Sequence, residues 1–355
     1  EYRGIRDRVG EIWREFSCLR RRDFFARSGK LLCLIYNLNV GSLMEAVDLD
    51  DVRVVLDETT RLAMSGILAG MMFTVALSLK LDDFKALQNQ PLRILGGVMA
   101  QVFGLPLLTF MLVFVLNPTA SIALGMFVVA SCPGGNMSNI LTHFARGNTA
   151  YSVSLTAISS VTAAILTPVS ILFWSNLYRP TADLVESLDI DPWMFLIQTA
   201  ALLAIPMLIG MIVSAKLPIF AEKLRRILTP LSILTLMAII VAGVVGNWNI
   251  VLTVGALVIP IAVLHNASAL GLGAITGRVL KLDTGRRRSL TFEVGIQNAG
   301  LGLIILLDQF DGVGGATALT AIWSIWHLIA GGALVGIFRY IDLSRNRKMA
   351  LGKTS

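Results

Sequence analysis

The chain of 355 residues is 55% hydrophobic and 15% charged, carries a net charge of +7 and has a mean hydropathy of +0.73. Soluble domains carry about 25% charged residues, so this composition excludes an ordinary soluble enzyme or binding module and predicts a helical membrane protein. The three cysteines, Cys18, Cys33 and Cys132, show no CxxC or paired spacing, so neither a disulfide framework nor a zinc site is expected.

The first segment in chain order, residues 1–30, is basic and carries apolar residues near helical spacing. This pattern predicts an amphipathic helix on the inner face of the membrane, with a solvated tail as the alternative. No cleavable signal with a short apolar core is expected. Residues 31–47 are apolar but short and contain Asn37, Asn39 and Glu45, so hydropathy alone leaves this segment at the membrane interface.

Nine further windows are apolar over about the 20 residues that a helix needs to cross roughly 30 Å of hydrocarbon. We expect these helices at 62–80, 92–116, 120–143, 149–175, 193–216, 227–247, 250–277, 289–308 and 316–341. The predicted fold class is therefore an all-α, polytopic membrane protein.

The loops between these windows alternate in charge. HFARGN and GRVLKLDTGRRRS belong to a basic set, whereas NLYRPTADLVESLDIDP and LDQFDG are acidic. Lys and Arg are enriched in cytoplasmic loops, so we expect the basic set in the cytoplasm. Segments 1–30 and 45–61 obey the same rule only if residues 31–47 cross the membrane. This favours ten helices with both termini in the cytoplasm, with nine helices as the alternative.

Two windows are interrupted by residues that break helices. The stretch CPGGNMSN, Cys132 to Asn139, combines a proline with two glycines, and FEVGIQNAGLG, Phe292 to Gly302, spreads three glycines among polar residues. Ten helices divide into two sets of five, and each break then falls in the fourth helix of its set, which is typical of transporters with inverted repeats. Freed backbone groups need partners inside protein or water, so the breaks predict a cavity or an ion site. A packing bend is the alternative for the Pro-Gly-Gly sequence alone.

Glu293 is a carboxylate within the second interrupted window, and Gln297 follows it by one helical turn. Lys and Arg cluster at the ends of the windows, which leaves a proton or a bound cation to neutralise Glu293. Hard cations prefer carboxylate, amide and hydroxyl oxygens. Such groups occur near the first break and in the following window, at Ser138, Asn139, Ser152 and Thr156. Two alternatives remain, namely a Glu293 that reaches the headgroups and hydroxyls that bond only to their own helix.

The sequences CPGGNMSNILTHFARGNTAYSVSLTAIS and EVGIQNAGL resemble the bile acid:sodium symporter family, and the order of elements agrees from about Leu62 to Tyr340. The resemblance implies ten helices, or nine, in two inverted repeats, with a panel domain and a core domain in which the two broken helices cross. The transporter domain would then span 31–341, with its core around 92–175 and 250–308, its panel in the remaining helices and a cytoplasmic tail at 342–355.

The resemblance also implies two sodium sites that share Glu293. The first would use Ser138, Asn139, Ser152, Thr156 and Glu293, and the second would use Gln101, Glu293, Gln297 and the backbone carbonyls of Val294 and Ile296. The implied substrate residues are Asn136, Asn266, Asn298 and His327. Some bacterial relatives have a small hydroxyl residue in place of Asn136 and an asparagine in place of Leu328, so the particular substrate stays open.

The implied function is secondary active transport, in which sodium drives a bile-acid-like or smaller organic anion into the cytoplasm by alternating access. We expect an integral protein of a bacterial inner membrane, with lipid and a small molecule as partners and no nucleic acid or protein partner. A proton-coupled carrier, an arsenite-type carrier that uses Cys132 and a non-transporting sensor remain as alternatives. The sequence contains no HExxH, GxSxG or P-loop pattern, so an enzyme is not expected.

Overall fold

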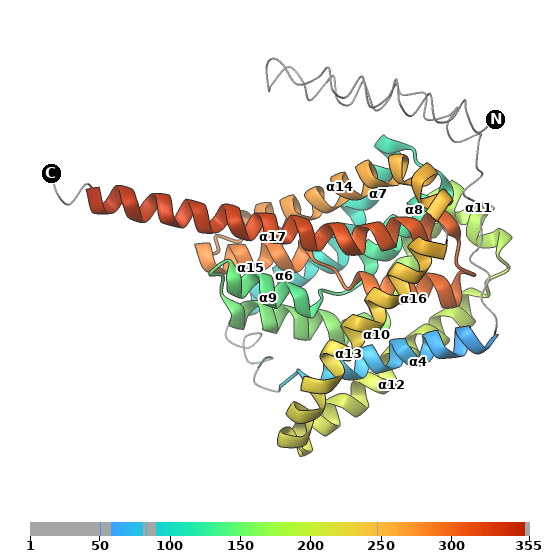
Figure 1. The fold of residues 1–355 in the computed structure, drawn as a ribbon, viewed down its shortest axis with the longest axis horizontal. Helices are drawn as coiled ribbons and strands as arrows, with labels where there is room; N and C mark the ends of the chain where they lie inside the picture. The colour runs from blue at the N-terminus through green and yellow to red at the C-terminus, as the bar shows by residue number, and fades with distance from the viewer. Residues whose placement is uncertain (1–49, 51–57, 81–82, 84–89, 247, 352–355) are drawn as a thin grey trace, which may run out of the picture. The chain divides into compact units, whose positions relative to one another are not determined.

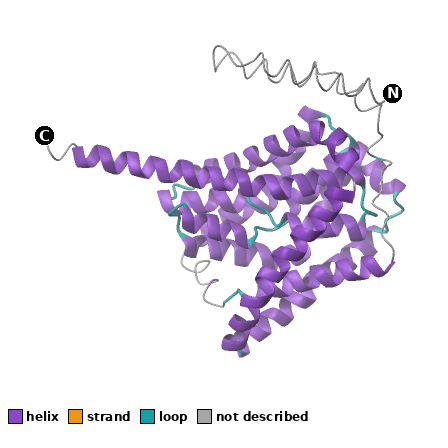
Figure 2. Cartoon of the chain, viewed as in Figure 1, coloured by secondary structure: helices purple, strands orange, loops and turns teal. Residues whose placement is uncertain are grey.

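The computed structural model describes residues 50, 58–80, 83, 90–246 and 248–351. The chain divides into two units, Glu1–Asp48 and Leu49–Ser355, and all of the described residues belong to the second. The expected amphipathic segment 1–30 and the tenth candidate span at 31–47 lie outside the described residues. Among the residues that are described, helices are joined by short loops and no strand is formed, as Figure 2 shows.

The described helices follow one another along the chain and are labelled in Figure 1. They are α4 (Glu58–Leu77), α6 (Pro91–Met99), η2 (Ala100–Gly104), α7 (Leu105–Leu116), α8 (Ala120–Ser131), α9 (Asn136–Phe144), α10 (Thr149–Leu177), α11 (Arg179–Ser187), α12 (Pro192–Lys216), α13 (Pro218–Gly246), α14 (Trp248–Val279), α15 (Thr284–Gly295), α16 (Ala299–Gln309) and α17 (Gly314–Leu351).

Six stretches of helix in the described part of the chain are long and apolar enough to cross a membrane. They are Glu58–Leu77, Pro91–Leu116, Thr149–Leu177, Pro192–Lys216, Gly255–Val279 and Gly314–Arg345. The stretch from Pro91 to Leu116 combines α6, η2 and α7, and η2 is a π-helical turn. The two windows with predicted breaks are split into α8 and α9 and into α15 and α16, so each half is shorter than a full span. The predicted helical membrane fold is confirmed at this level.

Side-chain caps explain where several helices begin. Asn148 Oδ1 accepts a hydrogen bond from the backbone of Tyr151 at 2.9 Å, and Asp191 Oδ1 accepts one from Trp193 at 2.7 Å. Asp283 caps α15 in the same way, so this helix starts five residues before the expected position of 289. The acidic loop expected between α10 and α12 contains the helix α11, which begins with a proline in its first turn and buries Leu184 and Val185.

The two broken helices occupy the interior of the described unit. Every residue of α8 from Ser121 to Ser131 is buried, and so is every residue of α16 from Ala299 to Leu307. Helix α17, red in Figure 1, packs against α14, α8 and α16, whereas α4 packs mainly against α12 and α13. The polar breaks are therefore shielded from lipid by other helices, as irregular backbone in a membrane requires.

Helices α14 and α15 approach closely because α14 has a glycine at the contact. A Cβ atom at Gly273 would lie 2.6 Å from the carbonyl oxygen of Leu290 and 2.8 Å from Cα of Thr291. Both neighbours are backbone atoms, so a side chain at this position forces the helices apart. Gly271, two residues earlier, faces open space, and a Cβ atom added there would have no neighbour within 4 Å. This pair of glycines separates the effect of helix packing from the effect of helix propensity.

We expect Gly273→Ala to lower the free energy of unfolding by about 1–3 kcal/mol through overpacking. Gly271→Ala should leave it unchanged or raise it by up to about 1 kcal/mol, because alanine favours the helix. The measurement is the thermal unfolding midpoint of both variants in detergent. Equal midpoints for the two variants would contradict the close approach of α14 and α15.

Candidate functional site

The two helix breaks meet and satisfy each other's backbone groups. The backbone amide of Asn298 donates to the carbonyl oxygen of Pro133 at 2.8 Å, and that of Gly135 donates to Ile296 at 3.4 Å. Together with the antiparallel bridge between Gly134 and Gln297, these bonds join two short extended segments. Peptide groups that a continuous helix would have paired internally are paired here across the crossing.

Glu293 lies beside this crossing and is fully buried. Ser138 Oγ donates to Glu293 Oε2 at 2.7 Å, Thr156 Oγ1 lies 2.8 and 2.9 Å from the two carboxylate oxygens, and Ser152 Oγ lies 3.4 Å from Oε2. Asn139 Oδ1 is 3.3 Å from the hydroxyl of Thr156. The structure thus brings together Glu293 and the four side chains that the sequence grouped around it.

Oxygen atoms that accept hydrogen bonds outnumber the protons available in this cluster. Each hydroxyl carries a single proton. The hydroxyl of Ser138 faces both Glu293 and the carbonyl oxygen of Gly135, which is 2.8 Å away. The hydroxyl of Thr156 faces Glu293, Asn139 Oδ1 and, at 3.1 Å, the carbonyl oxygen of Ser152. A hard cation would coordinate the surplus lone pairs, so the donor set fits such an ion.

The geometry decides between the alternatives left open for Glu293 and its hydroxyl neighbours. Glu293 does not reach the headgroups, because its side chain is 0% exposed. None of the ion pairs formed within the described residues includes Glu293, and the nearby Arg288 is paired with Asp342. The hydroxyl of Thr156 lies closer to Glu293 than to the carbonyl of its own helix. Glu293 is therefore surrounded by neutral oxygen-bearing groups.

A second polar group lies on the other side of Gly134. Gln101 Nε2 donates to Gln297 Oε1 at 3.2 Å, and Gln297 Nε2 donates to the carbonyl oxygen of Val294 at 2.8 Å. Gln101 Oε1 is buried without a hydrogen-bond partner. A Cβ on Gly134 would overlap Glu293 Oε1 and lie 3.1 Å from Gln101 Nε2, so only glycine fits between the two groups. A buried acceptor without a partner is costly, which makes Gln101 Oε1 a candidate ligand.

Gln101 lies in the π-helical turn η2, a feature that is frequent at functional sites. The carbonyl oxygen of Ile296, which the sequence analysis also grouped with Gln101, accepts the amide of Gly135 in the crossing. Hydrogen bonds therefore join Gln101, Gln297 and the carbonyl oxygen of Val294 to one another, whereas the carbonyl oxygen of Ile296 bonds across the crossing.

The four candidate substrate residues are less closely grouped. Asn266 Nδ2 donates to the carbonyl oxygen of Gly295 at 2.7 Å, and Asn298 Oδ1 accepts the amide of Leu301 as the cap of α16. His327 Nδ1 lies 2.8 Å from the carbonyl oxygen of Trp323 in its own helix. Asn136 is the half-buried first residue of α9. Among the hydrogen bonds of the described residues, none joins two of these four side chains.

Some polar contacts near the site were not found by sequence reasoning. Thr142 Oγ1 donates to Ser152 Oγ at 3.3 Å and so extends the hydroxyl cluster. Its position four residues after Ser138, on the same face of α9, is the signal that would have identified it. Thr109 Oγ1 lies 2.8 Å from Nε2 of the buried His265, a contact between residues 156 positions apart that no local pattern indicates.

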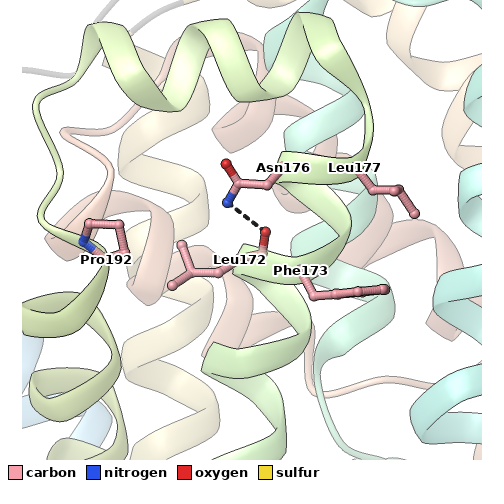
Figure 3. Close-up of a pocket in the computed structure, with 5 residues that line it drawn as sticks. All are labelled: Leu172, Phe173, Asn176, Leu177 and Pro192. Atoms are coloured by element: carbon pink, nitrogen blue, oxygen red, sulfur yellow. Dashed lines mark hydrogen bonds between the residues drawn. The ribbon is translucent and has the colours of Figure 1, made fainter.

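A surface depression lies away from these residues, at the end of α10 and the start of α12 (Figure 3). It is lined by Leu172, Phe173, Asn176, Leu177 and Pro192. Asn176 Nδ2, the one amide in it, donates to the carbonyl oxygen of Leu172 at 2.8 Å. The lining is apolar and its amide is satisfied within its own helix, so the crossing of the breaks remains the candidate site.

No group of three or more His, Cys, Asp or Glu side chains that could hold a metal ion occurs in the part of the chain that the structure describes. The oxygen cluster at Glu293 combines one carboxylate with hydroxyls and an amide, a donor set that suits a hard cation better than a transition metal. This chemistry agrees with the comparison to known proteins. Residues 66–254 match the model of the Sodium Bile acid symporter family. The chain belongs to this family.

Relatives in the family carry transport functions in their names. The chain is 33% identical to the uncharacterized sodium-dependent transporter YocS of Bacillus subtilis (strain 168) over 285 residues, 80% of this chain and 84% of that protein. It is 31% identical to the probable sodium/metabolite cotransporter BASS1, chloroplastic, of Arabidopsis thaliana over 271 residues, 76% of this chain and 64% of that protein. It is 26% identical to the ileal sodium/bile acid cotransporter of Homo sapiens over 279 residues, 77% of each.

Membership in the symporter family establishes the class of the protein. It is an integral membrane protein of a family of transporters, and not an enzyme. The chain spans most of the Bacillus relative and slightly less than two thirds of the plant relative.

The hydroxyl of Thr156 provides a direct test of the oxygen cluster. Thr156→Val keeps the shape of the side chain but leaves Glu293 Oε1 without its close donor, while Oε2 keeps the hydroxyl of Ser138. This loss should cost about 1.5–3 kcal/mol of unfolding free energy. Thr162→Val is the matched control on the same helix, because Thr162 bonds only to the carbonyl oxygens of Ile158 and Ser159. Thermal unfolding in detergent measures both variants. An equal loss of stability in the two would speak against a special role for Thr156.

Proposed function

We propose that this protein is a sodium-coupled symporter that carries an organic anion into the cytoplasm. The observation that supports the proposal most directly is the buried Glu293, which faces three hydroxyl groups and no basic side chain. A buried carboxylate is expensive unless a proton or a cation compensates its charge. Sodium ions supply the charge and use the surplus oxygen lone pairs.

Two sodium ions are proposed to bind on either side of Gly134. One ion is held by Ser138, Asn139, Ser152, Thr156 and Glu293, and the other is held by Gln101, Glu293, Gln297 and the carbonyl oxygens of Val294 and Ile296. The close contacts within each group and the unpartnered Gln101 Oε1 support this division. Glu293 contributes to both sites and links their occupancy.

Coupling follows from the position of these sites at the crossing of the broken helices. Sodium binding holds the two extended segments in one arrangement and shapes the neighbouring surface for the anion. By linkage, the anion then raises the affinity for sodium by the same factor. Helix α9, which starts at Asn136, has no side-chain cap at its N-terminus, and helix N-termini favour a carboxylate or sulfonate. Movement of the core helices against the panel helices would then expose the site to the cytoplasm.

The substrate is proposed to be an amphipathic or small carboxylate, bound near Asn136, Asn266, Asn298 and His327. The names of relatives range from sodium/metabolite to sodium/bile acid cotransporters, which supports an organic anion as the class. By the resemblance, Asn136 and Leu328 stand where some bacterial relatives have a small hydroxyl residue and an asparagine, so only the class of anion is proposed. We further propose a bacterial inner membrane as the location.

Two rival transport functions have less support. An arsenite-type carrier would need soft ligands, and Cys132 is buried at the break without a cluster of His, Cys, Asp or Glu among the described residues. A proton-coupled carrier would place its proton on Glu293, which the same three hydroxyl groups would then surround. The following experiment distinguishes a sodium-coupled carrier from a proton-coupled one.

Sodium should stabilise the protein and potassium should not. At about a hundred times its dissociation constant, a bound ion adds roughly 2.7 kcal/mol to the free energy of unfolding. Glu293→Gln keeps the size of the side chain and removes the charge, so this variant should lose the response to sodium. The measurement is the thermal unfolding midpoint in detergent, titrated with sodium against potassium at constant ionic strength.

Asp308→Asn is the matched control for Glu293→Gln. It neutralises a half-buried carboxylate at the far end of α16, where Asp308 accepts a hydrogen bond from Ser65 at 2.9 Å. This control should keep the full sodium response of the wild type. If the wild type responds to pH and not to sodium, the proton-coupled function replaces the proposal.

The proposed orientation is tested by cysteine labelling. In a background with Cys18 and Cys33 replaced by serine, Asp183→Cys in α11 should react with an impermeant thiol reagent added outside intact cells. Thr284→Cys at the start of α15 should react only after the membrane is opened. Both positions are exposed, so accessibility reports the side of the membrane. The reverse pattern would invert the proposed topology.

A further inference from the structure

Arg288 is a buried cation in α15. It contacts the end of α9 that lies away from the crossing. The side chain of Arg288 is 8% exposed. One guanidinium nitrogen donates to Asp342 Oδ2 at 2.9 Å and to the carbonyl oxygen of Ala145 at 2.8 Å, and the other donates to Asp342 Oδ1 at 2.5 Å. The guanidinium also lies over the ring of Phe338, 4.9 Å from its centroid. A single side chain therefore connects α15, the end of α9 and α17.

Further hydrogen bonds join the first half of α15 to the residues that follow α9. The backbone amide of Asn148, just after α9, donates to the carbonyl oxygen of Gly285 at 3.1 Å. Ser289 Oγ donates to the carbonyl oxygen of Asn148 at 2.8 Å. We call this group of contacts, formed by Arg288, Ser289, Gly285, Ala145, Asn148 and Asp342, the clasp. It joins the first half of α15 to the loop that connects α9 and α10.

The clasp and the crossing bracket the candidate ion cluster. Helix α9 has nine residues, with Ser138 in its first turn near the crossing and Ala145 at its end in the clasp. Helix α15 runs the other way, from the clasp to the crossing, and Glu293 follows Arg288 by about 7.5 Å of helix rise. The distance between Ser138 and Glu293 is therefore held from both ends.

An apolar cluster fills the space between these two junctions. Leu141 and Ala145 of α9 pack with Phe292 and Ile296 of α15, and Phe338 of α17 covers them. Phe292 and Phe338 meet edge to face, with centroids 6.0 Å apart. Because cores are close-packed and transmit strain, a displacement of the clasp would be passed along both short helices to the cluster.

Arg288 is buried and Asp342 is partly exposed. Such an ion pair contributes little net stability, because the desolvation of Arg288 and the screening of Asp342 by solvent offset the attraction between the charges. The value of the Arg288 and Asp342 pair is therefore geometric. The planar guanidinium binds the carboxylate in a fork and reaches Ala145 at the same time, and a lysine ammonium group cannot reproduce this arrangement. The carbonyl of Ala145 is at the negative end of α9, which also favours a cation.

We infer that Arg288 is a positioning residue, which acts through the clasp to hold α9 and α15 at the spacing that the cation site at Glu293 needs. This inference rests on the proposed sodium function. Arg288 does not touch the ion. It fixes the two helices that carry Ser138, Asn139 and Glu293, and Asp342 fixes Arg288.

The test is a sodium titration of the full chain in detergent, with the thermal unfolding midpoint as the signal and potassium as the balancing ion. Arg288→Lys and Asp342→Asn should each raise the sodium concentration for half-maximal stabilisation about tenfold, equivalent to about 1.4 kcal/mol. The double variant should be shifted no further than the stronger single variant, because both changes break one unit. Saturating sodium should still stabilise all three proteins.

Arg286→Lys is the matched control on the same helix. Arg286 forms a partly exposed pair with Asp283 at 3.4 Å and takes no part in the clasp, so its half-maximal sodium concentration should equal that of the wild type. Asp342→Asn keeps the bond from Arg288 to Ala145 and serves as the milder test if Arg288→Lys fails to fold.

The sodium titrations distinguish a positioning role of the clasp from a purely structural one. If the clasp variants melt at lower temperature but show the wild-type sodium concentration at half-maximal effect, the clasp is only structural and the inference is overturned while the proposed function stands. If the wild type itself shows no response to sodium, the proposed function fails and the inference fails with it. An equal shift of the half-maximal sodium concentration in Arg286→Lys and Arg288→Lys would also overturn the inference. Replacing any guanidinium by an ammonium group at this end of the helix would then explain both shifts.

Discussion

The crossing of two interrupted helices is the constraint on which the rest of the structure depends. Each break frees peptide groups that lipid cannot pair, at Pro133 in the first and at the extended residue Ile296 in the second, so each needs partners from elsewhere in the protein. Each break supplies the hydrogen-bonding groups that the other lacks. The burial of α8 from Ser121 to Ser131 and of α16 from Ala299 to Leu307 agrees with this, since the helices around them must exclude lipid from the crossing.

The crossing also determines the electrostatics of the site. It places a carboxylate from α15 against hydroxyls from α9 and α10 with more acceptor oxygens than protons. The hydroxyl protons alone do not satisfy all of these acceptor oxygens, and a bound cation would coordinate the remaining lone pairs. The free energy of binding such a cation would then help to hold the two extended segments in one arrangement. A polar network with every acceptor already hydrogen-bonded would gain little from a bound ion. The surplus of acceptor oxygens over protons at Glu293 is therefore what would allow an ion to control a conformational change.

Much of this arrangement follows from local sequence. Apolar windows locate the helices, and helix breakers locate the two interruptions. The four-residue spacing of Ser152 and Thr156 puts both hydroxyls on one face of α10 toward Glu293. The earlier start of α15 is also a local effect, because Asp283 caps it. Contacts that depend on the chain returning to the same place could not be predicted, such as the pairing of Arg288 with Asp342 across 54 residues or of Thr109 with His265. The segments 1–30 and 31–47 remain predictions.

The ion cluster and the proposed substrate residues differ in how they are held. The cluster is fixed by short spacings within three helices and by one crossing, and its members bond to one another. Asn266, Asn298 and His327 instead bond to backbone groups of the second break, of α16 and of α17. A substitution at one of the proposed substrate residues would therefore change the hydrogen bonds offered to an anion without changing a proposed ligand of the cation. A family built in this way can keep one coupling ion while its members diverge in substrate, which agrees with relatives named for metabolites and for bile acids.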